Sequence, residues 1–205
     1  MEVQAHGNIY EDIKIRELTG LSKKEYDKLK KNGYTSAMDI VRGLHSDVDI
    51  SIKTTGSNSV GCGDILKRRK ELQYDMIVAR YTQEGGQKIF HTEYTFHIKP
   101  EHEELLWGTM SIEQINEYAN KIKGVDHKNP DARHKYYTEQ KKPWKNELAW
   151  DKNALMQPNP KVDSGAARVQ CSVNINKLIN SGIEFQEKEI NILMESGRRI
   201  RKYKK

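Results

Sequence analysis

The chain has 205 residues, of which 36% are hydrophobic and 31% are charged, and its mean hydropathy is −0.87. This composition predicts a polar protein with one substantial core, and no apolar run approaches the ~20 residues that span a bilayer. The two cysteines are too few for a disulfide framework or a cysteine-based zinc site. Because the first residues lack a signal-peptide pattern, we expect a cytoplasmic protein with no membrane partner.

Basic residues outnumber acidic residues by 35 to 29, which gives a net charge of +6. They gather at positions 67–70, 127–145 and 198–205. Such clusters suit a polyphosphate partner, because each phosphate that a protein neutralises releases counterions. The alternative interpretation is a set of solvated faces and a basic tail.

Two helices are expected near the start of the chain. Apolar residues at helical spacing predict a first helix over residues 8–18, with Glu11 near its start. Ser22 followed by Glu25 is a capping-box pattern, which predicts a second helix that ends at Gly33.

A β-hairpin is expected next, from two runs rich in β-branched residues at positions 37–43 and 48–54. Because strand side chains alternate between faces, three polar residues of the second run share one face near Asp39 on the partner strand, namely Asp49, Ser51 and Lys53. Carboxylates beside a lysine are the groups that a Mg2+-dependent phosphodiesterase uses. The acids hold the cation through oxygen, and the lysine orients the attacking water and offsets developing charge.

This arrangement resembles the PD-(D/E)xK signature of the restriction-endonuclease-like nuclease superfamily, over roughly residues 6–98. That family has an Asp at the end of one strand, an acid-x-Lys on the next, and in many members a Glu on a preceding helix. The resemblance implies that Asp39 is the central metal ligand and that Lys53 is the catalytic lysine. It also implies that the carbonyl group of Ile52 is a further ligand and that Glu11 is an outer contact to the metal or to water.

The chain departs from the family pattern at one position, because Ser51 stands where the family has Asp or Glu. Either Asp49, two residues earlier on the same face, supplies the missing carboxylate, or the site is degenerate. The resemblance implies an α/β (α+β) fold with a mixed central β-sheet flanked by helices. It also implies Mg2+ as the cofactor, with Mn2+ as a substitute.

The segment after the hairpin offers candidate contacts to DNA. Residues 54–59 predict a loop whose hydroxyl groups, backbone N–H groups and Asn58 amide could face a phosphate, or else a simple turn. Asp64 is expected to cap a short helix, with a metal ligand as the alternative. Three basic residues of that helix are candidates for the DNA backbone, namely Lys67, Arg68 and Arg69.

Residues 74–81 and 88–98 predict two strands joined by a hairpin loop. His91 and His97 fall on the more polar face of the second strand. This position suits either a metal site or cross-strand hydrogen bonds. Helix, hairpin, helix, strand and strand then follow in the order of the αβββ core that the resemblance implies.

The C-terminal half is expected to be partly irregular. A helix is expected after Pro100, and residues 111–124 predict an amphipathic helix whose apolar stripe serves the core or a dimer surface. Residues 125–163 show no clear element and interleave basic and aromatic residues, including Lys141 and Lys142. This pattern favours nucleic-acid contact, or an irregular excursion anchored by tryptophans.

Residues 166–175 predict a strand that carries Arg168 and Gln170 on its polar face. These side chains can make bidentate contacts to guanine and adenine edges, and they are also ordinary on an exposed sheet edge. Residues 185–195 predict a final helix.

We expect residues 1–110 to form a nuclease-like catalytic core. Residues 111–205 are expected to form an extension for DNA recognition or dimerisation, packed with the core as one domain. The leading hypothesis is a metal-dependent, sequence-specific endonuclease of double-stranded DNA, of the type II restriction–modification kind, acting as a homodimer. The alternatives are a DNA-binding protein with a degenerate nuclease core, and a junction resolvase, phage exonuclease or nicking repair enzyme. An RNA-binding or structural phage-like protein is a third possibility.

Overall fold

The computed structural model describes residues 5–30 and 38–195, and it contains both helices and strands. The chain divides into two compact units. The first comprises Met1–Val60, Gln73–Ile98 and Gly182–Lys205, and the second comprises Gly61–Leu72 and Lys99–Ser181. Each unit is assembled from non-consecutive segments, so the division does not coincide with the expected boundary near residue 110.

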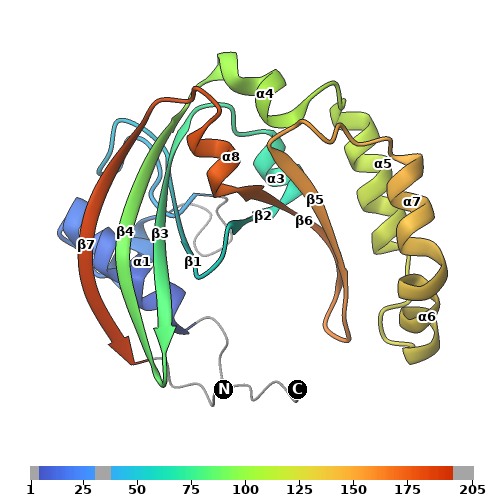
Figure 1. Ribbon diagram of the computed structural model, residues 1–205, viewed down its shortest axis with the longest axis horizontal. Helices are drawn as coiled ribbons and strands as arrows, with labels where there is room; N and C mark the ends of the chain where they lie inside the picture. The colour runs from blue at the N-terminus through green and yellow to red at the C-terminus, as the bar shows by residue number, and fades with distance from the viewer. Residues whose placement is uncertain (1–4, 31–37, 196–205) are drawn as a thin grey trace. The chain divides into compact units, whose positions relative to one another are not determined.

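A mixed β-sheet forms the centre of the first unit (Figure 1). Its strands are β1 (Ile50–Thr55), β3 (Tyr74–Glu84), β4 (Gln87–Ile98) and β7 (Phe185–Glu195), in the order β1-β3-β4-β7. β1 is parallel to β3, whereas β3 is antiparallel to β4 and β4 is antiparallel to β7. The two strands expected at 74–81 and 88–98 are confirmed, and each is slightly longer than expected.

Helix α1 (Ala5–Thr19) packs on one face of this sheet. Tyr10 stacks on Phe90 of β4 with ring centroids 5.0 Å apart, and Ile15 is fully buried in the same cluster. The helix ends before Gly20, whose φ of 76° lies in the left-handed region that glycine adopts without strain. The helix expected over residues 8–18 is therefore confirmed.

Helix α2 (Lys23–Leu29) begins with the expected capping box between Ser22 and Glu25. It ends earlier than expected, because Lys30 already has an extended backbone, with φ −71° and ψ 127°. The expected helix end at Gly33 lies outside the described residues.

Two expected elements of this unit differ from the structure. In the first arm of the hairpin, the described residues form only an isolated antiparallel bridge between Ile40 and Ile50, and Ala37 lies outside the described residues. The segment expected as a final helix is instead strand β7. Ile190 and Ile192 pack against the core cluster at a spacing of two, which is the spacing of a strand.

In the second unit, the described residues form a sheet with the order β2-β6-β5. These strands are β2 (Ser59–Asp64), which belongs to this unit from Gly61 onward, β6 (Ala167–Asn174) and β5 (Met156–Val162). The helices are α3 (Ile65–Arg69), η2 (Pro100–His102), α4 (Glu103–Trp107), α5 (Ile112–Lys123), α6 (Pro130–Lys135), η3 (Tyr136–Gln140), α7 (Lys141–Glu147) and α8 (Ile175–Ile179). The amphipathic helix, now α5, and the strand expected at 166–175 are confirmed.

The segment 125–163 was expected to be irregular, and the structure corrects this. It contains α6, η3 and α7, followed by strand β5. β5 lies at the edge of its sheet and carries Pro158 and Pro160. Backbone N–H groups alternate in direction along a strand, so positions 158, 160 and 162 share one direction. The Val162 N–H group donates to the Tyr137 hydroxyl group rather than to β6, so the prolines remove no hydrogen bond between β5 and β6. Within residues 5–30 and 38–195, no helix has the length and apolar character needed to cross a membrane.

Candidate active site

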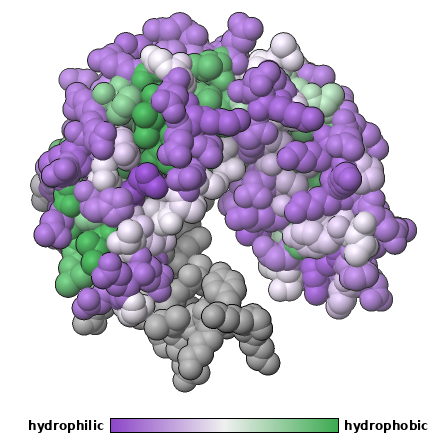
Figure 2. Space-filling view, in the orientation of Figure 1, coloured by the Kyte–Doolittle hydropathy of each residue, from purple (hydrophilic) through white to green (hydrophobic). Residues whose placement is uncertain are grey.

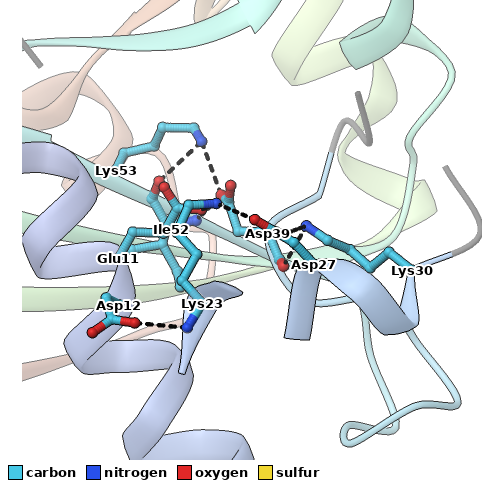
Figure 3. A network of polar contacts seen from close by, with 8 residues as sticks. All are labelled: Glu11, Asp12, Lys23, Asp27, Lys30, Asp39, Ile52 and Lys53. Carbon is cyan, nitrogen blue, oxygen red and sulfur yellow. Dashed lines mark hydrogen bonds and ion pairs between the residues drawn. The ribbon is translucent and has the colours of Figure 1, made fainter. Parts of the chain in front are cut away.

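The centre of the candidate site is a three-way contact between Asp39, Ile52 and Lys53 (Figure 3). Asp39 Oδ2 accepts a hydrogen bond of 2.6 Å from the Ile52 N–H group and lies 3.1 Å from Lys53 Nζ. The same ammonium group donates to the Ile52 carbonyl oxygen at 2.9 Å. The antiparallel bridge explains this placement, because Asp39 N donates to the Ile50 carbonyl oxygen at 2.9 Å and so lies beside β1.

Glu11 reaches the same place from helix α1 (Figure 3). Burial raises the pKa of Glu11, and the negative charge of Asp39 raises it further, while Lys23 and Lys53 oppose both effects. Each of these groups is therefore close enough to act on the Glu11 carboxylate. The structure thus brings together Glu11, Asp39, Ile52 and Lys53, which come from helix α1, the bridge segment and β1.

Two lysines that were not predicted as site residues also lie here, Lys23 of helix α2 and Lys30, which directly follows the helix. Lys23 Nζ lies 2.8 Å from Glu11 Oε1 and 2.9 Å from Asp27 Oδ2. Lys30 Nζ lies 2.6 Å from Asp27 Oδ1 and donates to the Asp39 carbonyl oxygen at 3.3 Å. The Lys23–Asp27 spacing of four residues within a helix was the available signal. Charges of alternating sign therefore surround the two site carboxylates.

Asp49 and Ser51, the two candidates for the second acid position, have different surroundings. Asp49 Oδ1 accepts a hydrogen bond of 2.9 Å from the Arg42 N–H group, in the turn that precedes β1. Ser51 is 0% exposed. The Asp49 carboxylate therefore stabilises the turn before β1, whereas Lys53 contacts the Asp39 carboxylate.

A hollow of about 350 Å3 begins at the residue that follows Lys53. It is lined by Thr54, Thr55, Gly56, Ser57, Tyr81 and Gln83. The loop is tightly built, because Thr55 Oγ1 donates to the Ser59 carbonyl oxygen at 2.8 Å and a Cβ atom on Gly56 would lie 2.7 Å from the Tyr81 ring. Asn58 is exposed, and its Oδ1 accepts a hydrogen bond of 3.2 Å from Arg80.

The basic residues of α3 are only partly available at the surface. Lys67 is exposed, but Arg68 and Arg69 are 2% and 8% exposed. Arg68 Nε donates to the Cys62 carbonyl oxygen at 3.2 Å, and Arg69 Nη2 lies 2.6 Å from Glu103 Oε1. The expectation that both arginines face the DNA backbone therefore requires correction, since both serve the interior of the second unit.

The other DNA-contact candidates lie in the second unit. Arg168 and Gln170 are half-buried on β6, and Arg168 Nη2 lies 3.1 Å from Asp163 Oδ2. Lys141 is half-buried and Lys142 is exposed, both at the start of α7.

The two strand histidines make local hydrogen bonds. His97 Nδ1 lies 2.8 Å from Asp75 Oδ1, and the two residues are opposite each other on β4 and β3. His91 Nδ1 lies 2.8 Å from Thr92 Oγ1. Among the described residues, no three or more His, Cys, Asp or Glu side chains form a group that could hold a metal ion.

The oxygen atoms of the candidate site nevertheless fit Mg2+ in kind. The Glu11 and Asp39 carboxylates and the Ile52 carbonyl group are hard oxygen ligands, and Mg2+ is commonly held by one or two protein carboxylates together with water and phosphate. Burial and, after it, the charge of Asp39 raise the pKa of Glu11 and so favour its protonated form, whereas a divalent cation would favour the ionised form.

Comparison with protein-family models, curated proteins and solved structures found no match to this chain.

Proposed function

We propose that this protein is a Mg2+-dependent DNA endonuclease whose site is formed by Glu11, Asp39, Ile52 and Lys53. One observation carries the proposal. A single lysine ammonium group lies 3.1 Å from the Asp39 carboxylate and 2.9 Å from the Ile52 carbonyl oxygen, which are two of the three groups proposed as metal ligands. A cation therefore already bridges the oxygens at which a second cation would bind.

Asp39, Glu11 and the Ile52 carbonyl group would hold the metal ion. When bound, Mg2+ would supply Lewis-acid stabilisation of the charge that develops on the phosphoryl oxygens. Lys53 uses two of its three N–H bonds on Asp39 and Ile52. The third can donate to the attacking water or to a phosphate oxygen, which orients the nucleophile and offsets negative charge.

The proposal includes a restriction-endonuclease-like core, because a mixed sheet with α1 on one face carries these residues. It also includes sequence-specific cleavage of double-stranded DNA by a homodimer at a palindromic target. The candidate contacts to DNA that remain at least partly exposed are Asn58, Lys67, Lys141, Lys142, Arg168 and Gln170.

The test is incubation with unmodified plasmid and phage DNA, in Mg2+ or in EDTA. Lys53→Met and Asp39→Asn are the site variants. Lys188→Met is the matched control, because the Lys188 side chain is 63% exposed on β7. We expect discrete fragments that require Mg2+, persist in the control and disappear in both site variants. A smear with the same dependence would support a nuclease without sequence specificity, and cleavage that survives Lys53→Met would refute the proposed site.

One observation favours a second candidate function, a DNA-binding protein with a degenerate nuclease core. Ser51 stands at the position that the family fills with a second strand acid, and the carboxylate of Asp49, two residues earlier, accepts a hydrogen bond from Arg42 N in the turn before β1. This function predicts a gel shift that weakens steeply with salt, and intact DNA with Mg2+ or Mn2+ on duplex, single-stranded and branched substrates.

A further inference from the structure

Arg80 of β3 lies on the same face of the first unit's sheet as Lys53. β1 is parallel to β3, with Lys53 opposite Val78 and Thr55 opposite Arg80. Residues that are opposite each other on neighbouring strands share a face of the sheet, and so do residues two apart on one strand. Because neighbouring strands are about 4.8 Å apart and the rise per residue is about 3.3 Å, the backbone positions of Lys53 and Arg80 are about 8 Å apart.

The Arg80 guanidinium group lacks an acidic partner in the described part of the chain. Arg80 is half-buried, its Nη2 donates to the Asn58 side chain, and among residues 5–30 and 38–195 it forms no ion pair. Three other arginines each form an ion pair with a carboxylate, namely Arg16, Arg69 and Arg168. The positive charge of Arg80 is therefore available to an anionic group of a ligand.

Tyr94 of β4 lies close to Arg80 on the same face. It is opposite Val78 and is 7% exposed. Burial raises the pKa of Tyr94 and Glu187 raises it further, whereas Arg80 opposes both effects, so Arg80 is near the Tyr94 hydroxyl group. This hydroxyl group donates to Glu187 Oε1 at 3.2 Å. Asn58 and Tyr94 thus limit the positions that the guanidinium group can take.

Asn58 and Arg80 together present only hydrogen-bond donors to a ligand. A guanidinium group has no acceptor atom, so the Asn58 atom that faces Arg80, at 3.2 Å, is the amide oxygen. The two N–H bonds of the Asn58 amide remain for a ligand, as do the guanidinium N–H bonds that do not contact Asn58. Since Asn58 is exposed and Arg80 is half-buried, a ligand can reach the pair from solvent. Donors beside a positive charge suit the oxygens of a phosphate group.

The nearby acidic residues of this face lie on the side of Arg80 away from Lys53. Glu189 of β7 is opposite Thr92 of β4, which is opposite Arg80, so two strand spacings of about 4.8 Å separate Glu189 from Arg80. Glu187 is two residues from Glu189 on β7, and its Oε1 already accepts a hydrogen bond. These carboxylates repel an anion over β7, whereas Lys53 attracts one over β1. An anion is therefore directed to the space between Arg80 and Lys53.

We propose that Arg80 and Asn58 bind a backbone phosphate of the DNA strand, one or two positions from the phosphate at Lys53. One strand carries a phosphate about every 3.4 Å along the helix axis, so a cation about 8 Å from Lys53 reaches a phosphate close to the cleaved one. Most side chains of the first unit that Figure 2 draws are hydrophilic, which suits a charged ligand better than an apolar one. This subsite rests on the proposed function, because Lys53 defines where the strand passes, and it adds a contact that holds the strand without taking part in cleavage.

The experiment measures binding of duplex DNA to the full chain by fluorescence anisotropy, over a series of salt concentrations. EDTA is present throughout, so metal-dependent cleavage does not interfere. Arg80→Met removes the proposed contact, and Lys188→Met is the matched control. Lys188 is opposite Glu93, which contacts Tyr10 of α1, so the control removes the same charge from the other face of the sheet.

Arg80→Met should weaken binding by about ten-fold. It should also make the plot of log K against log salt shallower by about 0.9, which is the change for one phosphate contact, while Lys188→Met changes neither quantity. Equal salt slopes and affinities of Arg80→Met and Lys188→Met would overturn the proposal.

Asn58→Asp separates a phosphate contact from a purely structural tie between the loop and β3. It keeps an acceptor oxygen for Arg80, so the unfolding temperature should be unchanged or higher, but the donors are lost and DNA binding should fall by about ten-fold. Gln186→Glu is the matched control, because it adds one negative charge on the face that Lys188 occupies. Binding of Asn58→Asp that equals that of Gln186→Glu would show that the contact is structural only.

The same variants distinguish this subsite from the nuclease. Weaker binding and a shallower slope of Arg80→Met, with a parent protein that cuts no DNA in Mg2+, would leave the phosphate subsite standing and remove the nuclease. Cleavage by the parent, with unchanged binding and slope of Arg80→Met, would leave the nuclease standing and overturn the subsite.

Discussion

Replacing Glu93 with alanine tests whether a buried polar network fixes helix α1 on the sheet. The Tyr10 hydroxyl group donates to Glu93 Oε2, and Lys14 Nζ lies 3.1 Å from Glu93 Oε1. Tyr10, Lys14 and Glu93 are 0%, 5% and 6% exposed, so removing the carboxylate leaves a buried ammonium group and a buried hydroxyl group without this partner. Losing one partner of a buried ion pair costs about 3–5 kcal/mol, and we expect the lower end of this range because Lys14 Nζ also lies 2.8 Å from Oε2 of the half-exposed Glu17.

Urea denaturation followed by circular dichroism measures this loss. For a chain of this size it corresponds to a decrease in Tm of about 6–20 °C. Glu187→Ala is the matched control, because Glu187 also accepts from a tyrosine, at 3.2 Å from Tyr94 Oη, but is exposed on β7. We expect the control to lose about 1 kcal/mol or less.

The triple replacement Tyr10→Phe, Lys14→Met and Glu93→Met gives the complementary result. It removes all three polar groups together and should recover most of the lost stability, because no charge remains buried without a partner. A Glu93→Ala protein within about 1 kcal/mol of the parent would refute the reasoning. Since Tyr10 and Lys14 flank Glu11 in the helix, Glu93→Ala should also slow any cleavage that depends on Glu11.

Three further perturbations have defined outcomes. Because burial raises the pKa of Tyr118 to about 12 from 10.0, the unfolded state loses this proton first and stability declines above pH 10. Tyr118→Phe should make that decline smaller by about 1.4 kcal/mol at pH 11 in urea titrations, and the part that remains comes from other tyrosines with a raised pKa, such as Tyr10 and Tyr136. Gly56→Ala forces a Cβ atom to within 2.7 Å of the Tyr81 ring and should cost about 1–3 kcal/mol in thermal unfolding, whereas Gly61→Ala meets no atom within 4 Å and should cost less. Ser22→Ala removes the capping box of α2 and should cost about 1 kcal/mol by the same measurement.

Local signals in the sequence predicted much of the first unit. The capping box at Ser22 depends on residues three apart, and the β3–β4 hairpin depends on two adjacent β-rich runs, so neither needs distant information. The proximity of Asp39 to Lys53 also followed from a short segment that doubles back on itself. These features could be predicted because the contacts that create them are close in sequence.

The remaining features depend on partners that are far away in the sequence. β7 was expected to be a helix for two reasons. Its charged residues, including Glu187 and Lys188, obscure the alternation of Ile190 and Ile192. Its partner strand β4 lies far earlier in the sequence, before the segment Lys99–Ser181 of the second unit. No strand was expected over β5, and Pro158 is compatible with one because an edge strand has one side without ladder bonds. The ion pair between Glu11 and Lys23 was not predicted, because the two residues belong to different helices.

The pairing of β4 with β7 has a consequence for the order in which the protein is made. Phe96 lies opposite Phe185, and the segment Lys99–Ser181 of the second unit separates them in the chain. A ribosome therefore delivers this whole segment while β4 still has an open edge, which is a template for unwanted strand pairing. That edge stays open until β7 emerges, so we expect the yield to depend on chaperones that hold exposed strands during synthesis.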